Sequence, residues 1–247
     1  MRRAASALVS LAGFLLIWKA ATLIGSYPEY ILPAPEVVVA RGARAIASGV
    51  LWQHTAATLL EVVLGFGLGA TAAIAVGIVL AKSLLVERAL SPYIVAAQAV
   101  PILALAPLLD IWFGGGLLAR VIICALIVFF PIAIATMVGV RSADPLLAEM
   151  LRSLGAGPSQ ITTRLEIPSA LPVIFGGLRV GVTLAVIGAV VAEWAGASIG
   201  LGVLINIANQ GLFDTPLMFV ALVTLAVIGL TFYTLVLAVE HRAVRQS

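Results

Sequence analysis

Residues able to support metal, acid–base or nucleophilic chemistry are few in this chain and lie far apart. Its 247 residues include two histidines, His54 and His241, and one cysteine, Cys124. A structural zinc site needs three or four such ligands at short spacings, and no second histidine or cysteine lies near any of these three. We therefore expect no metal site, no cofactor site and no catalytic residue in this chain, and we interpret Cys124 as a small packing residue.

The sequence contains no convincing nucleotide-binding motif, although two patterns come close to one. Residues 67–72 match the dinucleotide fingerprint, but that motif follows a strand, and these residues lie inside an uncharged stretch. The two lysines, Lys19 and Lys82, lack the glycine of a phosphate-binding loop. We interpret the glycines spaced four apart, Gly65 with Gly69 and Gly177 with Gly181, as small residues that let helices approach closely.

Polar side chains inside apolar stretches are the remaining candidates, because a charge at the centre of a membrane costs about 2.5–3.5 kcal/mol on insertion scales. Glu61, Arg120 and two further acids belong to this class, but all lie near expected outer ends of spans, where water reaches them. The residues that we expect along a solute pathway are Gln98, Asp110, Glu193, Asn206 and Asn209. An anionic solute would need a buried cation, for which Arg120 and Arg179 are available.

The composition places these residues in a membrane protein. Hydrophobic residues make up 62% of the chain and charged residues 10%, and the mean hydropathy is +1.19. A soluble domain is about 45–50% apolar and about 25% charged, so soluble, disordered and disulfide-stapled classes are excluded. The net charge of +3 does not indicate nucleic-acid binding, because most basic residues fall on one side of the expected membrane.

Six stretches are long and apolar enough to cross a bilayer, which takes about 20 residues. They are residues 4–24, 62–81, 89–109, 121–140, 169–192 and 215–239. Residues 194–213 are also uncharged, but their serine, glycines and asparagines predict a short re-entrant or interfacial helix rather than a crossing.

The basic residues predict that both termini are cytoplasmic, because inner loops carry the excess of Lys and Arg. With six spans, nine basic residues fall inside and three outside. The inner ones are Arg2, Arg3, Lys82, Arg88, Arg141, Arg152, Arg164, Arg242 and Arg245, and the outer ones are Arg41, Arg44 and Arg120. Residues 26–54 then form an outer loop, in which Val39, Ala43, Ile46 and Val50 recur at helical spacing and predict an amphipathic helix.

The stretch from 141 to 168 differs from the rest because it is rich in charge and lies on the inner side. Asp144 can cap a helix that starts at Pro145, and Gly155 can end it. One face of this helix is apolar and consists of Leu146, Leu147, Met150, Leu151 and Leu154. A second short helix is expected from Gly157-Pro158 to about Glu166, where Pro168 stops it and Pro172 opens the fifth span.

The order Glu149, Gly155 and then Leu165-Glu166-Ile167-Pro168 resembles the loop signature of type I ABC importer permeases, the binding-protein-dependent transport inner membrane components. Met150 and Leu151 stand where that signature has two alanines. The motifs Ser153-Leu154-Gly155-Ala156 and Pro168-Ser169-Ala170-Leu171-Pro172 resemble the nitrate, sulfonate and taurine branch, as do Ala106-Pro107-Leu108, Trp112-Phe113-Gly114 and Phe129-Phe130-Pro131-Ile132. Gln98-Ala99-Val100-Pro101 and residues 104–116 are closer to permeases for riboflavin or pyrimidine vitamin precursors.

The resemblance implies an all-α permease of six transmembrane helices with a cytoplasmic coupling helix, and no enzymatic activity. Separate ABC ATPase subunits would bind ATP and magnesium, an extracytoplasmic binding protein would deliver the solute, and a second permease copy would complete the pathway in a bacterial inner membrane. It implies a first transmembrane helix at 1–25, an outer loop at 26–54 and a permease core at 55–247, with the coupling loop at about 141–168. The implied ATPase-coupling residues are Ala148, Glu149, Arg152, Ser153, Gly155, Ala156, Leu165, Ile167 and Pro168.

Our mechanistic hypothesis makes the helix at 145–154 a rigid lever that its apolar face holds to the membrane domain. We expect a small organic solute, riboflavin or a pyrimidine precursor, with sulfonate, taurine or nitrate as the alternative. Two other classes fit the sequence less well. An ion-coupled carrier would leave the polar loop without a role, and the sequence shows no inverted repeat of the kind such carriers have. A membrane enzyme would need a cluster of catalytic or metal-binding groups, and the sequence shows none.

Overall fold

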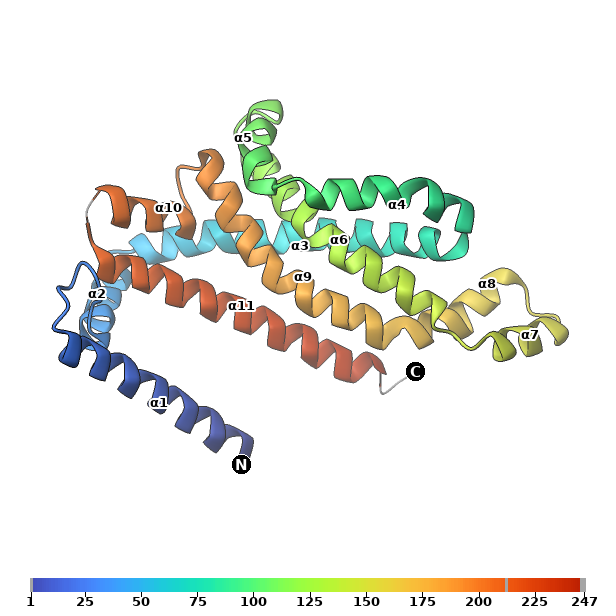
Figure 1. Cartoon of the computed structure of the whole chain (residues 1–247), viewed down its shortest axis with the longest axis horizontal. Coiled ribbons are helices and arrows are strands. Elements are labelled where there is room, and N and C mark those ends of the chain that lie inside the picture. Colours follow the sequence, from blue (N-terminus) through green and yellow to red (C-terminus); the bar gives the residue numbers. More distant parts are fainter. Residues whose placement is uncertain (1, 212, 245–247) are drawn as a thin grey trace. The chain divides into compact units, whose positions relative to one another are not determined.

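The computed structural model describes residues 2–211 and 213–244, and all regular elements among them are helical. In chain order they are α1 (Arg2–Gly25), α2 (Pro35–Ala47), α3 (Val50–Lys82), α4 (Leu84–Ala99), α5 (Ile102–Trp112), α6 (Leu117–Arg141), α7 (Pro145–Ser153), α8 (Pro158–Ile161), the π-helical η1 (Thr162–Glu166), α9 (Ile167–Gly196), α10 (Leu201–Asn206), the π-helical η2 (Ile207–Gly211) and α11 (Thr215–Val244). Figure 1 shows this order by colour. The expected all-α fold class is confirmed.

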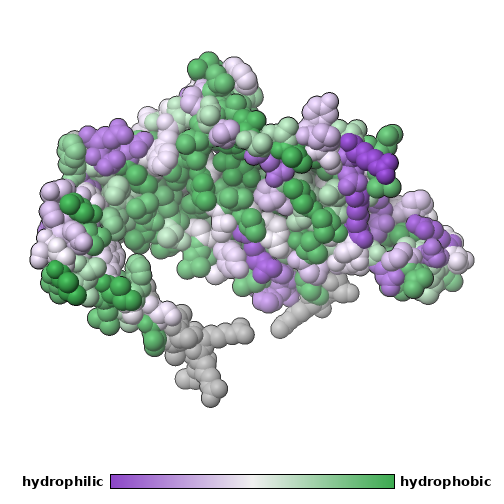
Figure 2. Space-filling model, viewed as in Figure 1, coloured by the Kyte–Doolittle hydropathy of each residue, from purple (hydrophilic) through white to green (hydrophobic). Residues whose placement is uncertain are grey.

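The chain divides into two compact units, which are described separately. The first unit holds residues 1–57 and 198–226, and the second holds residues 58–197 and 227–247. Apolar residues cover much of the face in view (Figure 2). This distribution is typical of a protein whose solvent is lipid.

Four helices among the described residues are long and apolar enough to cross a membrane by themselves. They are α3, α6, the continuous helix Pro158–Gly196 and α11, with 33, 25, 39 and 30 residues. α4 and α5 are long and apolar enough only when they are taken together as a bent pair, and the apolar part of α1, Ala12–Gly25, is shorter than a crossing. Each of the six expected spans therefore lies on a helix or, for the third, on a bent pair of helices, but four or five of them rather than six are long and apolar enough to cross.

The expected third span, residues 89–109, is broken rather than straight. α4 and α5 meet at an angle of 97°. Val100 has an extended backbone (φ −77°, ψ 124°) and Pro101 follows it. Proline disfavours the helical conformation of the residue before it, so a prediction from charge spacing alone missed this break.

The core of the second unit is the long contact between α6 and α9, which run side by side (Figure 1). Ile132 of α6 and Val182 of α9 are fully buried. A Cβ built on Gly177 would lie 2.5 Å from the Cβ of Ala135, and one on Gly181 would lie 2.6 Å from Cδ1 of Ile132. These glycines therefore permit the close approach, as their spacing predicted.

Glycines also permit a close approach between α3 and α6. A Cβ on Gly65 would lie 2.5 Å from Cβ of Cys124, and one on Gly69 would lie 2.6 Å from the carbonyl oxygen of Ala125. Cys124 is fully buried, and its Sγ lies 3.3 Å from the carbonyl oxygen of Ala185 in α9. Its interpretation as a packing residue is confirmed.

In the first unit, α2 does not bury the apolar stripe seen in the sequence. Val39 and Ile46 keep 71% and 66% of their surface exposed, while Val38 and Ala45 on the other face are buried. Arg41 Nε donates to Asp214 Oδ2 at 2.7 Å, which ties α2 to the start of α11. Ala43 is exposed as well, but α2 ends at Ala47 and the fourth residue of the predicted stripe, Val50, begins α3. The part of the stripe that lies on α2 is therefore available to the membrane surface, as expected for an amphipathic helix.

The described residues of the stretch predicted not to cross, 194–211 and 213, form no crossing, in agreement with the prediction. α9 continues through Trp194 to Gly196, and the short helices α10 and η2 follow after Gly200. Leu201 and Leu204 are buried in the first unit. A helix of six residues is about 9 Å long at 1.5 Å per residue, too short for the hydrocarbon core.

Candidate functional site

The coupling segment begins with a well-capped helix, α7. Asp144 Oδ1 accepts a hydrogen bond from the backbone N–H of Leu146 at 2.8 Å, and Pro145 occupies the first helical position. These features are the ones that the sequence predicted for the start of this helix.

A Schellman motif ends α7. Gly155 has φ +84°, its N–H donates to the carbonyl of Arg152 at 2.9 Å, and the N–H of Ala156 donates to the carbonyl of Leu151 at 3.0 Å. A residue without Cβ adopts this left-handed conformation at least cost. Caps at both ends hold nine residues in a single rigid helix.

The apolar face of α7 is exposed, which overturns one prediction. Leu146, Met150 and Leu154 keep 72%, 53% and 76% of their surface, and α7 has no buried residue. Its strongest described packing partner is α8, and both project beyond the ends of α6 and α9 (Figure 1). The hypothesis that this face holds the helix to the membrane domain is therefore wrong, and the face is free to meet another protein.

The return segment also differs from the prediction, because no proline ends it. α8, η1 and α9 form one helix from Pro158 to Gly196. In the π turn of η1 the N–H of Ile167 donates to the carbonyl of Thr162, five residues back. A proline ring normally collides with the carbonyl four residues back. The wider turn immediately before Pro168 lets the helix continue.

The predicted coupling residues fall into two groups. Ala148, Glu149, Arg152 and Ser153 lie on α7, with Gly155 and Ala156 at its end, whereas Leu165, Ile167 and Pro168 lie around the junction of η1 and α9. On α7, Glu149, Arg152 and Ser153 are exposed and Ala148 is half-buried. The three residues at the junction are half-buried.

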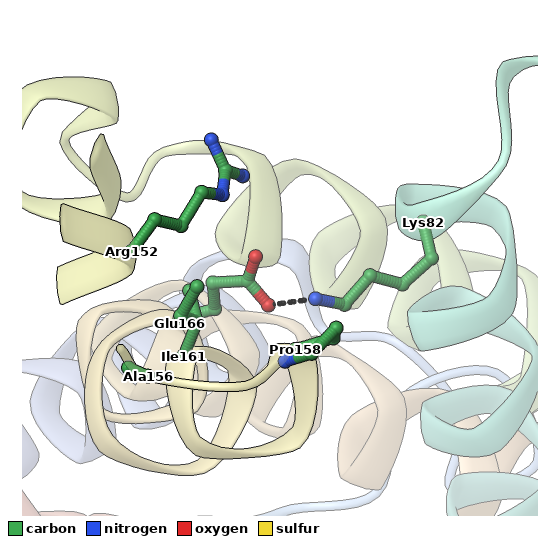
Figure 3. Close-up of a pocket in the computed structure, with 6 residues that line it drawn as sticks. All are labelled: Lys82, Arg152, Ala156, Pro158, Ile161 and Glu166. Atoms are coloured by element: carbon green, nitrogen blue, oxygen red, sulfur yellow. Dashed lines mark hydrogen bonds and ion pairs between the residues drawn. The ribbon is translucent and has the colours of Figure 1, made fainter. Parts of the chain in front are cut away.

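A small cavity of about 190 Å³ lies beside the first group, between the end of α7 and the helix that begins at Pro158. Its lining residues are Lys82, Arg152, Ala156, Pro158, Ile161 and Glu166 (Figure 3). Lys82 forms an ion pair with Glu166 there, and Arg152 extends toward the same carboxylate from the other side. Lys82 comes from the end of α3, so its place at this site is invisible in the loop motif.

Two buried polar contacts lie within the second unit. Arg120 Nη1 donates to Glu61 Oε1 at 2.7 Å, and Thr58 Oγ1 donates to Glu193 Oε1 at 2.5 Å. Both glutamates are 1% exposed, and Glu61 Oε2 has no hydrogen-bond partner among the described residues. The expectation that water reaches these acids at outer ends is therefore wrong for both glutamates.

The other predicted pathway residues are dispersed. Gln98 is exposed on α4, and its Nε2 lies 3.4 Å from the carbonyl of Ile94. Asp110 is half-buried and faces Gly196 at the end of α9. Asn206 is half-buried and Asn209 exposed in the first unit. Within the second unit the structure thus brings Asp110 to the helix end that carries Glu193.

No group of three or more His, Cys, Asp or Glu side chains within residues 2–211 and 213–244 is arranged to hold a metal ion. Charged side chains of the second unit instead form ion pairs between helices, such as Lys82 with Glu166 and Arg120 with Glu61. Such groups can position helices and recognise a polar ligand.

Comparison with known proteins identifies the class of this chain. Residues 55–245 match the family model of the binding-protein-dependent transport system inner membrane component. A riboflavin transport system permease protein of Chloroflexus aurantiacus is 48% identical over 96% of this chain and 88% of its own length. A formylaminopyrimidine transport permease protein of Halalkalibacterium halodurans is 34% identical over 98% of this chain and 96% of its own.

The fold has a counterpart among solved structures. An inward-facing structure of the MetNI methionine ABC transporter aligns with a TM-score of 0.70 and 19% identity, covering 80% of this chain and 97% of the matched chain. The fold class, the matched family and the similarity along nearly the whole chain agree. This chain belongs to the binding-protein-dependent transport system inner membrane components and is a non-catalytic permease subunit of an ABC importer.

Proposed function

We propose that this importer subunit carries an uncharged, ring-containing vitamin or vitamin precursor, riboflavin or a pyrimidine. The proposal rests on one observation: both arginines that could bind an anionic solute inside the membrane helices lie next to a carboxylate. Arg120 Nη1 lies 2.7 Å from Glu61 Oε1, and Arg179 Nε lies 3.4 Å from Glu240 Oε2. A sulfonate or nitrate would gain most from an unpaired cation along its route, and each of these arginines already has a carboxylate partner.

The relatives support the same substrate class. One is named for riboflavin transport and another for formylaminopyrimidine transport, and both solutes carry an uncharged heterocycle. Such a ring needs apolar contact and a few hydrogen bonds rather than a counter-charge. The pathway residues that we propose are Gln98, Asp110, Glu193, Asn206 and Asn209.

We further propose that α7 is the element through which a separate ABC ATPase drives the permease. Three exposed apolar side chains, Leu146, Met150 and Leu154, project from a capped, rigid helix. An amphipathic helix that leaves its apolar face uncovered fits a hydrophobic groove on a partner. The exposed Glu149 and Arg152 on the same helix add polar contacts that fix its register.

The remaining assembly follows from the family. We propose ATPase subunits that bind ATP and magnesium, an extracytoplasmic binding protein, a second copy of this permease and surrounding lipid. Both termini would be cytoplasmic, which places α7 on the side where ATP is available. Membership of this family removes the ion-coupled carrier as an alternative.

Uptake by the complete transporter tests the substrate. The permease, its ATPase and its binding protein are reconstituted in proteoliposomes, and ATP-dependent uptake of radiolabelled riboflavin, formylaminopyrimidine and taurine is compared. We expect uptake of riboflavin or the pyrimidine and none of taurine. Uptake of taurine alone would overturn the proposal.

Two substitutions test the coupling role. Glu149→Arg reverses a charge on the exposed surface of α7, and Gly155→Pro is incompatible with φ +84° and removes an N–H that is bonded to Arg152. Both should uncouple ATP hydrolysis from uptake while the protein inserts normally. The matched controls are Glu29→Arg, on an exposed acid of the first unit, and Gly155→Asn, because Asn tolerates the left-handed conformation. Full transport by either test variant would contradict the role.

A further inference from the structure

The last turn of α3 holds both ends of the coupling segment. Helix C-termini leave carbonyl groups without intrahelical partners, and cations bind there favourably. Arg141 Nη2 donates to the carbonyl of Leu80 at 2.8 Å, and its Nε donates to the carbonyl of Ala81 at 3.2 Å. Arg141 is the last residue of α6, three positions before the Asp144 cap of α7.

The return side of the segment is tied to the next residue of the same turn. Lys82 Nζ donates to Thr162 Oγ1 at 2.5 Å and forms an ion pair with Glu166. Thr162 and Glu166 are the first and last residues of η1. Figure 3 shows the lysine reaching across from α3 to this carboxylate. The coupling segment thus contacts α3 at both of its ends, through Arg141 before α7 and through η1 after α8.

Between these two ties the segment is supported mainly by itself. α7 packs chiefly on α8, and its Leu146, Leu147 and Met150 side chains are exposed. A displacement of α7 can therefore reach the membrane helices through the backbone at its two ends and through the contacts that those ends make. Both sets of contacts converge on residues 80–82.

α3 is suited to pass such a displacement onward. It is a continuous helix, and within the second unit its opposite half carries Thr58 and Glu61. These residues bond Glu193 of α9 and Arg120 of α6. One rigid helix therefore runs from the coupling segment to the buried polar contacts of the membrane core.

We propose that Lys82 and Arg141 are positioning residues, which fasten the two ends of the coupling segment to α3 so that movement of α7 moves α3. This inference rests on the proposed coupling role of α7. The ties are partly exposed, with 39% for the Lys82 side chain and 32% for Arg141, and exposed ion pairs contribute little to stability. Their loss should change coupling more than folding.

Lys82 gives the cleaner test, because Arg141 also pairs with Glu87 of α4 at 2.7 Å. The whole transporter is reconstituted in proteoliposomes, and solute transported per ATP hydrolysed is measured for Lys82→Glu, Glu166→Lys and the double exchange. We expect each single variant to lower this ratio about two- to fivefold, the range that an exposed ion pair contributes to an equilibrium. ATP hydrolysis itself continues, and the double exchange restores most of the ratio.

The matched control is Lys19→Glu, which breaks a comparable exposed lysine–glutamate pair with Glu36 in the first unit and should leave the ratio unchanged. Arg141→Gln tests the other tie independently and should also lower the ratio. A wild-type ratio in Lys82→Glu, or no recovery in the double exchange, would overturn the inference. Failure of the proposed function is distinguishable, because Glu149→Arg would then also transport normally.

Discussion

The contact between α6 and α9 and the surface of α7 are both built from apolar residues at helical spacing, yet one is buried and the other exposed. Ile132 at the first is fully buried, whereas Leu154 at the second keeps 76% of its surface. The glycines of α9 let its backbone approach α6, and no such close contact covers α7. Apolar periodicity therefore locates a helix but does not say whether its own chain, lipid or a partner covers it.

The comparison also separates stability from function. Residues at a closed interface contribute through packing, and altering them should unfold the protein. Residues on an uncovered face contribute through a partner, so altering them should leave folding intact. The following substitutions test that separation.

The largest effect is expected from Gly177→Leu. Even its Cβ would lie 2.5 Å from Ala135 Cβ. Added methylenes in a packed interface typically cost about 1–3 kcal/mol, and leucine adds four carbons where the first already collides, so we expect a loss above about 4 kcal/mol. We expect little folded protein in detergent, measured by size exclusion and thermal unfolding. The neighbouring Gly176→Leu is the control. A Cβ built on Gly176 would lie 4.0 Å from Nη2 of Arg179, which is the end of a flexible side chain on the same helix. Equal stability of the two variants would show that the interface is not closed.

A smaller loss is expected from Glu61→Ala, which leaves Arg120 without its carboxylate. Removing one partner of a buried ion pair costs about 3–5 kcal/mol, and we expect the lower end because the Arg120 side chain keeps 18% exposure. Thermal unfolding measures the loss. The double variant Glu61→Gln with Arg120→Gln removes both charges and should recover part of the stability. A double variant less stable than Glu61→Ala would contradict this account of the pair.

Leu154→Asn should change binding rather than stability. The side chain is 76% exposed, and substitutions at such positions usually alter stability by less than about 0.5 kcal/mol. We expect normal thermal unfolding and weaker co-purification of the ATPase. Leu85→Asn, on an 80% exposed leucine of α4, is the control. Equal loss of the ATPase in both variants would indicate a general surface effect.

The smallest effect concerns Glu36 of α2. A hydrogen bond from Lys19 lowers the pKa of Glu36 below its ordinary value of 4.5. Its carboxylate therefore contributes a little stability above that ordinary value, and the contribution is lost as the pH falls through the lowered pKa. Thermal unfolding of Glu36→Gln should fall slightly below that of the wild type at pH 7, and this difference should shrink as the pH is lowered below the ordinary pKa of 4.5. A difference that grows toward acid pH would have the wrong sign.

The sequence by itself determined the features that depend on neighbouring residues. The Asp144 cap, Pro145 at the first helical position and Gly155 at φ +84° follow from local backbone chemistry. The glycine spacings predicted close helix contacts, because residues four apart share a helix face. The composition required a membrane protein, because so few polar residues cannot cover a soluble surface.

Tertiary structure alone decided which of these elements meet. Glu61 pairs with Arg120 across 59 positions and Lys82 with Glu166 across 84, and no local pattern specifies a partner at such separations. The π turn before Pro168 and the 97° bend at Pro101 show that similar prolines have opposite effects. A proline continues a helix where the turn before it is widened and breaks one where the preceding residue is extended, so three-dimensional context decides the outcome.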